Sequence, residues 1–199
     1  PTDEITAYLA AINPVKKFTS NRDGKEVTYY RGALVWVSTE ETDDDEEGEM
    51  RMAISRLYSP DLPDLEVDRS YSFKANVEID EGGSMLFRLP NTFKDECKEV
   101  DQLYKKREVR DFLATISEPV SKIEDRPYEI CCVQGTIDSI NEGDTLRSFY
   151  ISDVSGYISV KVVLTDDELI EKIEDDIAEL KTVVVIGSIN RDCDAIFAM

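Results

Sequence analysis

The sequence predicts an all-β chain with a few helices, folded as two tandem five-stranded barrels joined by a helical linker. Segments rich in β-branched and aromatic residues, separated by turn-forming residues, recur over residues 1–94 and again over 127–199. Between them, residues 92–116 contain neither Gly nor Pro, and their apolar residues fall at roughly helical spacing. We therefore expect barrels at 1–94 and 127–199, and a linker at 95–126.

The first segment predicts five strands. Residues 5–18 are moderately apolar, and the polar residues 19–25 that follow are typical of a hairpin loop. Residues 27–38 are dense in β-branched and aromatic side chains, and Gly32 within them indicates a bulge or a sharp bend. The remaining strands are expected at residues 50–58, 69–79 and 84–89.

The last segment predicts three strands, a helix and two further strands. The strands are expected at residues 128–140, 147–153, 157–164, 182–190 and 194–199. The helix is expected at 166–179, because Thr165 and Glu168 have the spacing of a capping box. Its buried face is expected to comprise Leu169, Ile170, Ile173, Ile177 and Leu180.

Composition excludes several classes of function. The 199 residues carry 43 acidic and 23 basic side chains, a formal charge of −20, and no His. A Ser-His-Asp triad, His zinc ligands and a Cys-His pair are therefore absent, and we expect no catalytic residue, metal or cofactor. No apolar run approaches the roughly 20 residues that cross a bilayer, so we expect no membrane partner.

The four cysteines indicate a reducing, intracellular compartment: the cytoplasm, the nucleoid or the nucleus. Their spacing forms neither a CxxC motif nor an evident disulfide framework. Cys131 and Cys132 point to opposite faces of a predicted strand, so we expect one buried and one exposed thiol. The full set is Cys97, Cys131, Cys132 and Cys193.

Three stretches of the last segment carry a resemblance to a known family. They are Val133–Ile137, Arg147–Gly156 and Tyr157–Val163. Gly135 matches an early Gly in the first strand, and Asp153 with Gly156 matches an Asp-x-x-Gly turn between the second and third strands. With a helix between strands three and four, residues 128–199 resemble the oligonucleotide/oligosaccharide-binding (OB) domains of replication protein A and its archaeal and viral relatives.

The resemblance implies a non-enzymatic protein that binds single-stranded DNA in replication, recombination or repair. Over the first 90 residues it is limited to strand order and to the long aromatic second strand. Such domains bind single strands through basic groups that follow the phosphates and aromatic rings on which bases stack, at about 1–3 kcal/mol per base.

Basic and aromatic residues alternate with the expected core on the strands of both barrels. In the last barrel, Phe149, Ile151, Ile158, Val160 and Val162 are expected inside. The candidate binding residues on its outer face are Arg147, Tyr150, Tyr157 and Lys161. Those of the first barrel are Lys16, Lys17, Phe18, Arg22, Lys25, Tyr29, Tyr30, Arg31, Arg51, Arg56 and Lys74. Trp36 is expected in the core. The alternative for Tyr150 and Tyr157 is that they pack against the other barrel.

Residues 40–49 contain eight acids in ten positions. Residues 1–94 hold 19 acidic and 11 basic residues, and eight of the acidic ones lie in this run. The rest of the segment therefore has no more acidic than basic residues, and the negative net charge of the whole segment is compatible with a local basic groove. Three interpretations stay open. The run is a solvated loop, a segment that mimics the single strand or recruits replication and repair proteins, or a divalent-cation site, although it lacks the spacing of an EF-hand.

Two other functions stay open beside single-stranded DNA binding. The chain could be an OB-fold protein-interaction module, or an accessory subunit or fragment of a larger replication enzyme complex. The sequence does not distinguish DNA from RNA, because that depends on contacts to the 2′-hydroxyl. It also leaves open the oligomeric state, the orientation of the barrels and the source organism.

Overall fold

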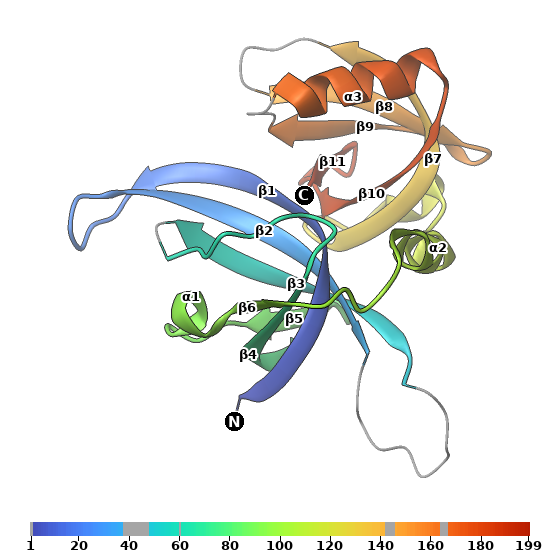
Figure 1. The fold of residues 1–199 in the computed structure, drawn as a ribbon. Coiled ribbons are helices and arrows are strands. Elements are labelled where there is room, and N and C mark those ends of the chain that lie inside the picture. The colour runs from blue at the N-terminus through green and yellow to red at the C-terminus, as the bar shows by residue number, and fades with distance from the viewer. Residues whose placement is uncertain (1, 38–47, 60, 142–145, 164–166) are drawn as a thin grey trace. The chain divides into compact units, whose positions relative to one another are not determined.

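The computed structural model describes residues 2–37, 48–59, 61–141, 146–163 and 167–199 (Figure 1). Strands dominate the described residues, which also hold three α-helices, so the predicted all-β class with a few helices is confirmed. The chain divides into two compact units, residues 1–109 (unit 1) and 110–199 (unit 2). The predicted linker at 95–126 and its boundaries stay a prediction.

Unit 1 contains the five predicted strands and one more. They are β1 (Asp3–Thr19), β2 (Glu26–Val37), β3 (Met50–Ser59), β4 (Ser70–Ile79), β5 (Met85–Arg88) and β6 (Lys98–Val100). Their order in the sheet is β1-β2-β3-β5-β4-β6, and β1 also pairs with β4. The pairing therefore runs from β1 through β2, β3, β5 and β4 back to β1. Only the β3–β5 pair is parallel among these described pairings.

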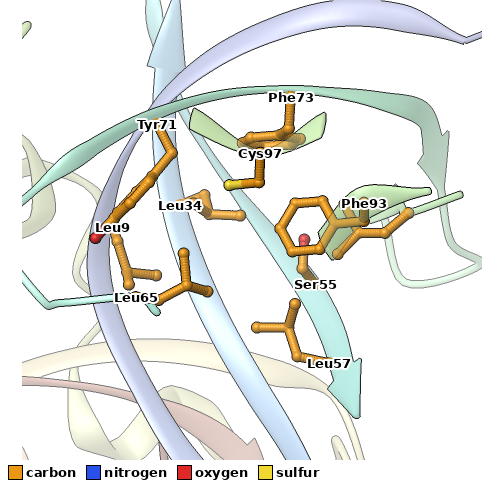
Figure 2. Close-up of a pocket in the computed structure, with 10 residues that line it drawn as sticks. Leu9, Leu34, Ser55, Leu57, Leu65, Tyr71, Phe73, Phe93 and Cys97 are labelled. Carbon is orange, nitrogen blue, oxygen red and sulfur yellow. The ribbon is translucent and has the colours of Figure 1, made fainter. Parts of the chain in front are cut away.

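Aromatic rings fill the core of unit 1. Trp36, which the sequence places in the core, is 8% exposed, and its ring lies 5.2 Å from that of Phe87 in an edge-on contact. Phe73 contacts Phe87 at 5.9 Å and Phe93 at 5.5 Å. Beside these rings a cavity of about 10 Å³ remains, which is close to the space of one water molecule (Figure 2). Ser55 lines it, and the Ser55 hydroxyl has no hydrogen-bond partner among the described residues.

The single helix predicted over residues 92–116 is wrong. The structure has a short helix α1 (Phe93–Glu96), then β6, then a second helix α2 (Lys106–Ile116). Phe93 and Cys97 pack against the core of unit 1, and Cys97 is extended, so the chain leaves the helix and pairs with β4. Two separate apolar groups thus produced the helical spacing. Val109 in α2 is 2% exposed.

Unit 2 is a closed barrel with the predicted order of elements. These are β7 (Ile130–Asn141), β8 (Leu146–Asp153), β9 (Gly156–Val163), α3 (Asp167–Ala178), β10 (Thr182–Ile189) and β11 (Ala195–Ala198). Around the barrel the strands follow the order β10-β11-β9-β8-β7, with β11 parallel to β9. The five residues predicted for its core are all buried: Phe149, Ile151, Ile158, Val160 and Val162.

Helix α3 agrees only in part with its predicted buried face. Ile173 packs against the barrel core, as predicted. Leu180 lies beyond the helix, is 67% exposed and has a positive φ of 52°, so its placement on the buried face is wrong. Thr165 and the side chains of Leu169, Ile170 and Ile177 lie outside the described residues.

The Asp-x-x-Gly turn joins β8 to β9 and also binds the segment before β7. The carboxylate of Asp153 accepts a hydrogen bond from the Ser155 amide at 2.7 Å and another from the Val120 amide at 2.9 Å. Val120 begins a 3-10 helix, η1 (Val120–Ile123). Burial disfavours the charged carboxylate, but the hydrogen bonds from Ser155, Val120 and Gly156 outweigh it and lower the pKa of Asp153.

Gly135 of β7 lies against the backbone of Ser152 on β8. A Cβ atom at this position would lie 2.4 Å from the backbone oxygen of Ser152, so no larger residue fits without a backbone shift. The glycine at position 135, which carries part of the resemblance to OB domains, is therefore required by the space available between the two strands.

Cys131 and Cys132 are both buried, so the expectation of one exposed thiol is wrong. Cys131 faces the barrel core, while Cys132 lies 3.4 Å from the Ser117 hydroxyl on the opposite side of β7. The segment containing Ser117 covers that side. Burial raises the pKa of Cys131 to about 12 and also raises that of Cys132, so both thiols are protonated at neutral pH.

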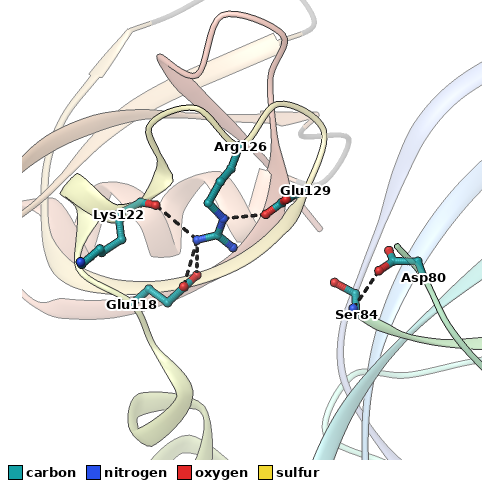
Figure 3. Close-up of polar contacts among 6 residues, drawn as sticks. All are labelled: Asp80, Ser84, Glu118, Lys122, Arg126 and Glu129. Carbon is teal, nitrogen blue, oxygen red and sulfur yellow. Dashed lines mark hydrogen bonds and ion pairs between the residues drawn. The ribbon is translucent and has the colours of Figure 1, made fainter. Parts of the chain in front are cut away.

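An arginine connects the segment before β7 to the start of the barrel (Figure 3). Arg126 Nη1 lies 2.9 Å from the Glu118 carboxylate, and Arg126 Nε lies 2.6 Å from that of Glu129. Arg126 also donates a hydrogen bond to the Lys122 carbonyl at 3.3 Å. These contacts fix the segment that covers Cys132.

In unit 1, the Ser84 amide donates a hydrogen bond to the Asp80 carboxylate at 2.8 Å in the β4–β5 turn (Figure 3).

We expect Ser55→Ala to leave the stability of unit 1 unchanged or to raise it, because the buried hydroxyl lacks a partner among the described residues. Ser70→Ala is the matched control. Ser70 is equally buried at 1%, but its hydroxyl accepts a hydrogen bond from the Leu103 amide at 3.3 Å, and its loss should cost about 1–3 kcal/mol. Urea unfolding measures both variants. Equal destabilisation by the two would contradict this account.

We expect Asp153→Asn to destabilise unit 2 by about 1–3 kcal/mol at pH 7, since it removes a charged hydrogen-bond acceptor. A carboxyl whose pKa is lowered on folding stabilises fully above its unfolded pKa, and the contribution is lost as pH falls through the folded pKa. The difference between wild type and variant should therefore shrink below about pH 4. Thermal unfolding from pH 3 to pH 7 tests this, and a difference that stays constant with pH would contradict it.

Candidate nucleic-acid interface

The outer face of β1, β2 and β3 gathers basic and aromatic side chains in two adjacent cross-strand rows. In one row, Lys16 of β1 lies opposite Tyr29 of β2, which in turn lies opposite Tyr58 of β3. In the next row, Arg31 of β2 lies opposite Arg56 of β3. The alternating residues of β2, such as Leu34, point into the core. The tyrosine–arginine face is defined as Lys16, Phe18, Tyr29, Arg31, Arg56 and Tyr58.

The rings of Tyr29 and Tyr58 are stacked, with centroids 5.2 Å apart and planes inclined by 25°. Arg31 Nε donates a hydrogen bond to the Tyr29 hydroxyl at 3.3 Å, and the guanidinium carbon lies 6.0 Å from the ring centre. Tyr29 is only 9% exposed, whereas Tyr58 is 44% exposed. The free ring surface is therefore that of Tyr58, with Tyr29 as its support.

At the end of the same face, Phe18 offers a second accessible ring. It is 40% exposed, and Lys16 Nζ lies 5.9 Å from its centre. Lys16 and Phe18 share one side of β1, as residues two apart on a strand do. Arg22 and Lys25 are exposed in the turn that joins β1 to β2. This face therefore combines cations with accessible rings.

Four candidates from the sequence lie elsewhere. Tyr30 packs against the core of unit 1, and Arg51 lies opposite Trp36, on the core side of the register. Lys17 points to the opposite side of β1 from Lys16 and pairs with a carboxylate of Glu26 at 3.5 Å. Lys74 is on β4, and its Nζ forms an ion pair with the Glu96 carboxylate at 3.9 Å.

Tyr58 was not among the sequence candidates, although it lies two residues after Arg56 on the same predicted strand. That spacing places the two side chains on one face. Its partner across the sheet depends on the β2–β3 register, which local patterns do not specify.

Unit 2 carries a smaller cluster on the outer face of β8, β9 and β11. Tyr150 and Tyr157 meet edge to face with centroids 5.9 Å apart, and Tyr157 is 74% exposed. Lys161 Nζ lies 5.7 Å from the ring centre of Phe197, which is 41% exposed. Phe197 is a further residue that the sequence did not identify; it enters through the parallel β9–β11 pairing. The side chain of Arg147 lies outside the described residues.

Over the described ranges, no group of three or more Cys, Asp and Glu residues is placed to hold a metal ion. None of the helices in that part of the chain is long and apolar enough to cross a membrane.

No protein-family model and no curated protein match the sequence. The chain is similar to a solved structure of a replication protein A heterotrimer bound to single-stranded DNA, at 13% identity and a TM-score of 0.48, over 92% of this chain and 43% of that one. It therefore spans less than half the length of that chain. The resemblance to replication protein A expected from the sequence is confirmed as a likeness in structure.

Two DNA complexes of another group are also similar to the chain. The Ifi202 HINa domain with a 20-bp duplex matches at 13% identity and a TM-score of 0.38, over 81% of this chain and 75% of that one. A murine DNA-binding protein bound to duplex DNA matches at 13% identity and a TM-score of 0.34, over 83% and 79%.

Proposed function

We propose that this protein binds single-stranded DNA, without catalysing a reaction, on two tandem OB-type barrels joined by the segment 95–126. The strand order supports this architecture, because β1-β2-β3-β5-β4 and β7-β8-β9-β11-β10 repeat one connectivity. OB barrels bind oligonucleotides on the face of their second and third strands and on the adjoining loop between strands one and two. The tyrosine–arginine face and the turn bearing Arg22 occupy these positions in unit 1.

The observation that carries the proposal is the accessible ring of Tyr58, stacked on Tyr29 and two residues from Arg56 on the same face. An unpaired base offers a π-face to such a ring, and the adjoining phosphate offers a charge to the arginines. In a duplex the bases are stacked on each other and unavailable. The chain's charge of −20 further disfavours non-specific attraction to duplex DNA.

The wider role that we propose is in DNA replication, recombination or repair, within a reducing intracellular compartment. The sequence resemblance supports the role, and four free cysteines support the compartment. Proteins of these processes are proposed to dock on the acidic run 40–49, most of which lies outside the described residues.

Substituting Tyr58 by Ala should weaken binding to oligo-dT by about 5- to 150-fold, the loss expected when one stacked base loses its ring. Tyr58→Phe should retain most of the affinity, because the ring remains. Fluorescence anisotropy with a labelled oligo-dT at low salt measures both.

Tyr128→Ala is the matched control, because Tyr128 is 70% exposed but belongs to neither aromatic cluster. Affinity should be unchanged in this variant. An equal loss in the Tyr58 and Tyr128 variants, or wild-type binding that does not weaken as salt rises, would contradict the proposal. Parallel titrations with oligo-U and with duplex DNA of the same length test the choice of single-stranded DNA.

A further inference from the structure

The geometry points to the outer face of β8, β9 and β11 as a surface that holds the bound strand by its bases and contacts one phosphate. This surface is called the unit 2 ring face, and it is defined as Tyr150, Tyr157, Lys161 and Phe197. The inference rests on the proposed function and adds a division of tasks to it. Most of the salt-dependent affinity comes from unit 1, and unit 2 contributes affinity that persists at high salt.

The first observation is that two rings of this face are accessible. Tyr157 and Phe197 are both exposed, and Tyr150 supports Tyr157 from one side through the edge-to-face contact of their rings. Phe197 lies opposite Lys161 in the parallel β9–β11 register. An unpaired base can stack on each exposed ring, at about 1–3 kcal/mol per base.

The second observation is that short side chains surround the two rings. Across β8 and β9, Ser152 lies opposite Tyr157 and Ser148 lies opposite Lys161. Ser159 lies between Tyr157 and Lys161 on the same side of β9. Side chains of this length do not cover the rings. Their hydroxyls both donate and accept hydrogen bonds, so they suit the mixed donors and acceptors at the edge of a base.

The third observation is the scarcity of cations. Among the described side chains of β8, β9 and β11, Lys161 is the one basic group. Tyr157 and Lys161 are four residues apart on β9, a distance of about 13 Å along the strand. Single-strand phosphates at the spacing of B-DNA, about 3.4 Å each, would number about four over this distance. One cation does not balance them, so the bases and not the phosphates are expected to face this surface.

The surrounding charge has the same consequence. The barrel at 127–199 holds 15 acidic and 5 basic residues. On β7, the exposed Asp138 lies opposite Tyr150, so a carboxylate borders the unit 2 ring face. A carboxylate repels a phosphate but not a neutral base. In unit 1, by contrast, Lys16 and Arg22 are exposed at the tyrosine–arginine face and its adjoining turn.

Oligo-dT with uncharged methylphosphonate linkages tests the inference, because it keeps the bases and removes the phosphate charges. We expect the full chain to bind this neutral oligomer with an affinity that does not change as salt rises, since no counterions are released. Tyr157→Ala and Phe197→Ala should each weaken this binding by about 5- to 150-fold, the loss of one stacked base. Tyr157→Phe should retain it, and Tyr128→Ala, which removes an exposed ring elsewhere in unit 2, is the control. Fluorescence anisotropy measures all of them.

Lys161→Gln tests the single phosphate contact. With ordinary oligo-dT, the slope of log affinity against log salt should fall by about 0.7, the value for one phosphate on a single strand. Binding of the neutral oligomer should be unchanged in this variant. Lys181→Gln is the matched control, because Lys181 is already paired with Glu179 at 2.9 Å, and its slope should equal that of the wild type. Equal slopes in the two variants would overturn the role of Lys161.

The two oligomers together separate this inference from the proposed function. If ordinary oligo-dT binds and Tyr58→Ala weakens it, while the neutral oligomer does not bind or ignores Tyr157→Ala and Phe197→Ala, the unit 2 ring face is overturned and the proposed function stands. If the neutral oligomer binds through Tyr157 and Phe197, while Tyr58→Ala and rising salt leave ordinary oligo-dT binding unchanged, the unit 2 ring face stands and the proposed site in unit 1 fails.

Discussion

The uninterrupted pairing of β2 with β3 is the constraint on which the candidate site depends. It runs without a bulge from Thr28 opposite Ser59 to Val37 opposite Met50. Because side chains alternate along each strand, this register decides which residues of β2 and β3 share the core face and which share the opposite face. It places Tyr29 beside Tyr58 and Arg31 beside Arg56. A shift of one residue would send the rings into the core and the apolar residues outward.

The cores of the two units are built from different types of side chain. Unit 1 fills its interior with aromatic rings, including Trp36 and Phe73, and leaves a buried serine without a partner among the described residues. Unit 2 uses mainly aliphatic residues, and relies on Gly135 for the close approach of two strands. The turn at Asp153 also binds the segment before β7, through the hydrogen bond from the Val120 amide. In both units the outer face of the second and third strands carries tyrosines and at least one basic residue.

Local patterns were sufficient to locate every described strand except β6 and to assign the core of unit 2, because alternation of apolar residues is a property of each strand alone. They failed over residues 92–116, where Cys97 packs against the core of unit 1 and Leu113 belongs to the later helix α2, although the spacing of these apolar residues imitates one helix. They also failed at Cys132, since the segment that covers its side of β7 is distant in sequence. Both failures have the same origin: burial by a distant segment leaves no local periodicity.

The types of residue in the candidate site could be predicted from the sequence, but not which individual residues come together in it. Arg31, Arg56 and Tyr29 could be selected as basic or aromatic residues on strands. Tyr58 met the same criterion, but its stack on Tyr29 depends on the β2–β3 register, and Phe197 joins its cluster through the parallel β9–β11 pairing. Conversely, Tyr30 and Arg51 satisfied the compositional criterion but lie on the core side of the sheet.

Mapping backbone amide chemical shifts during titration with oligo-dT tests the central claim most directly. Binding as proposed should shift the amides of β2 and β3 around Arg31 and Tyr58, the turn at Arg22, and the region of Tyr157 and Lys161 in unit 2. The amides of β4 around Lys74 should remain in place. Shifts confined to β4 and α3, or no shifts at saturating oligo-dT, would contradict single-stranded DNA binding on these faces.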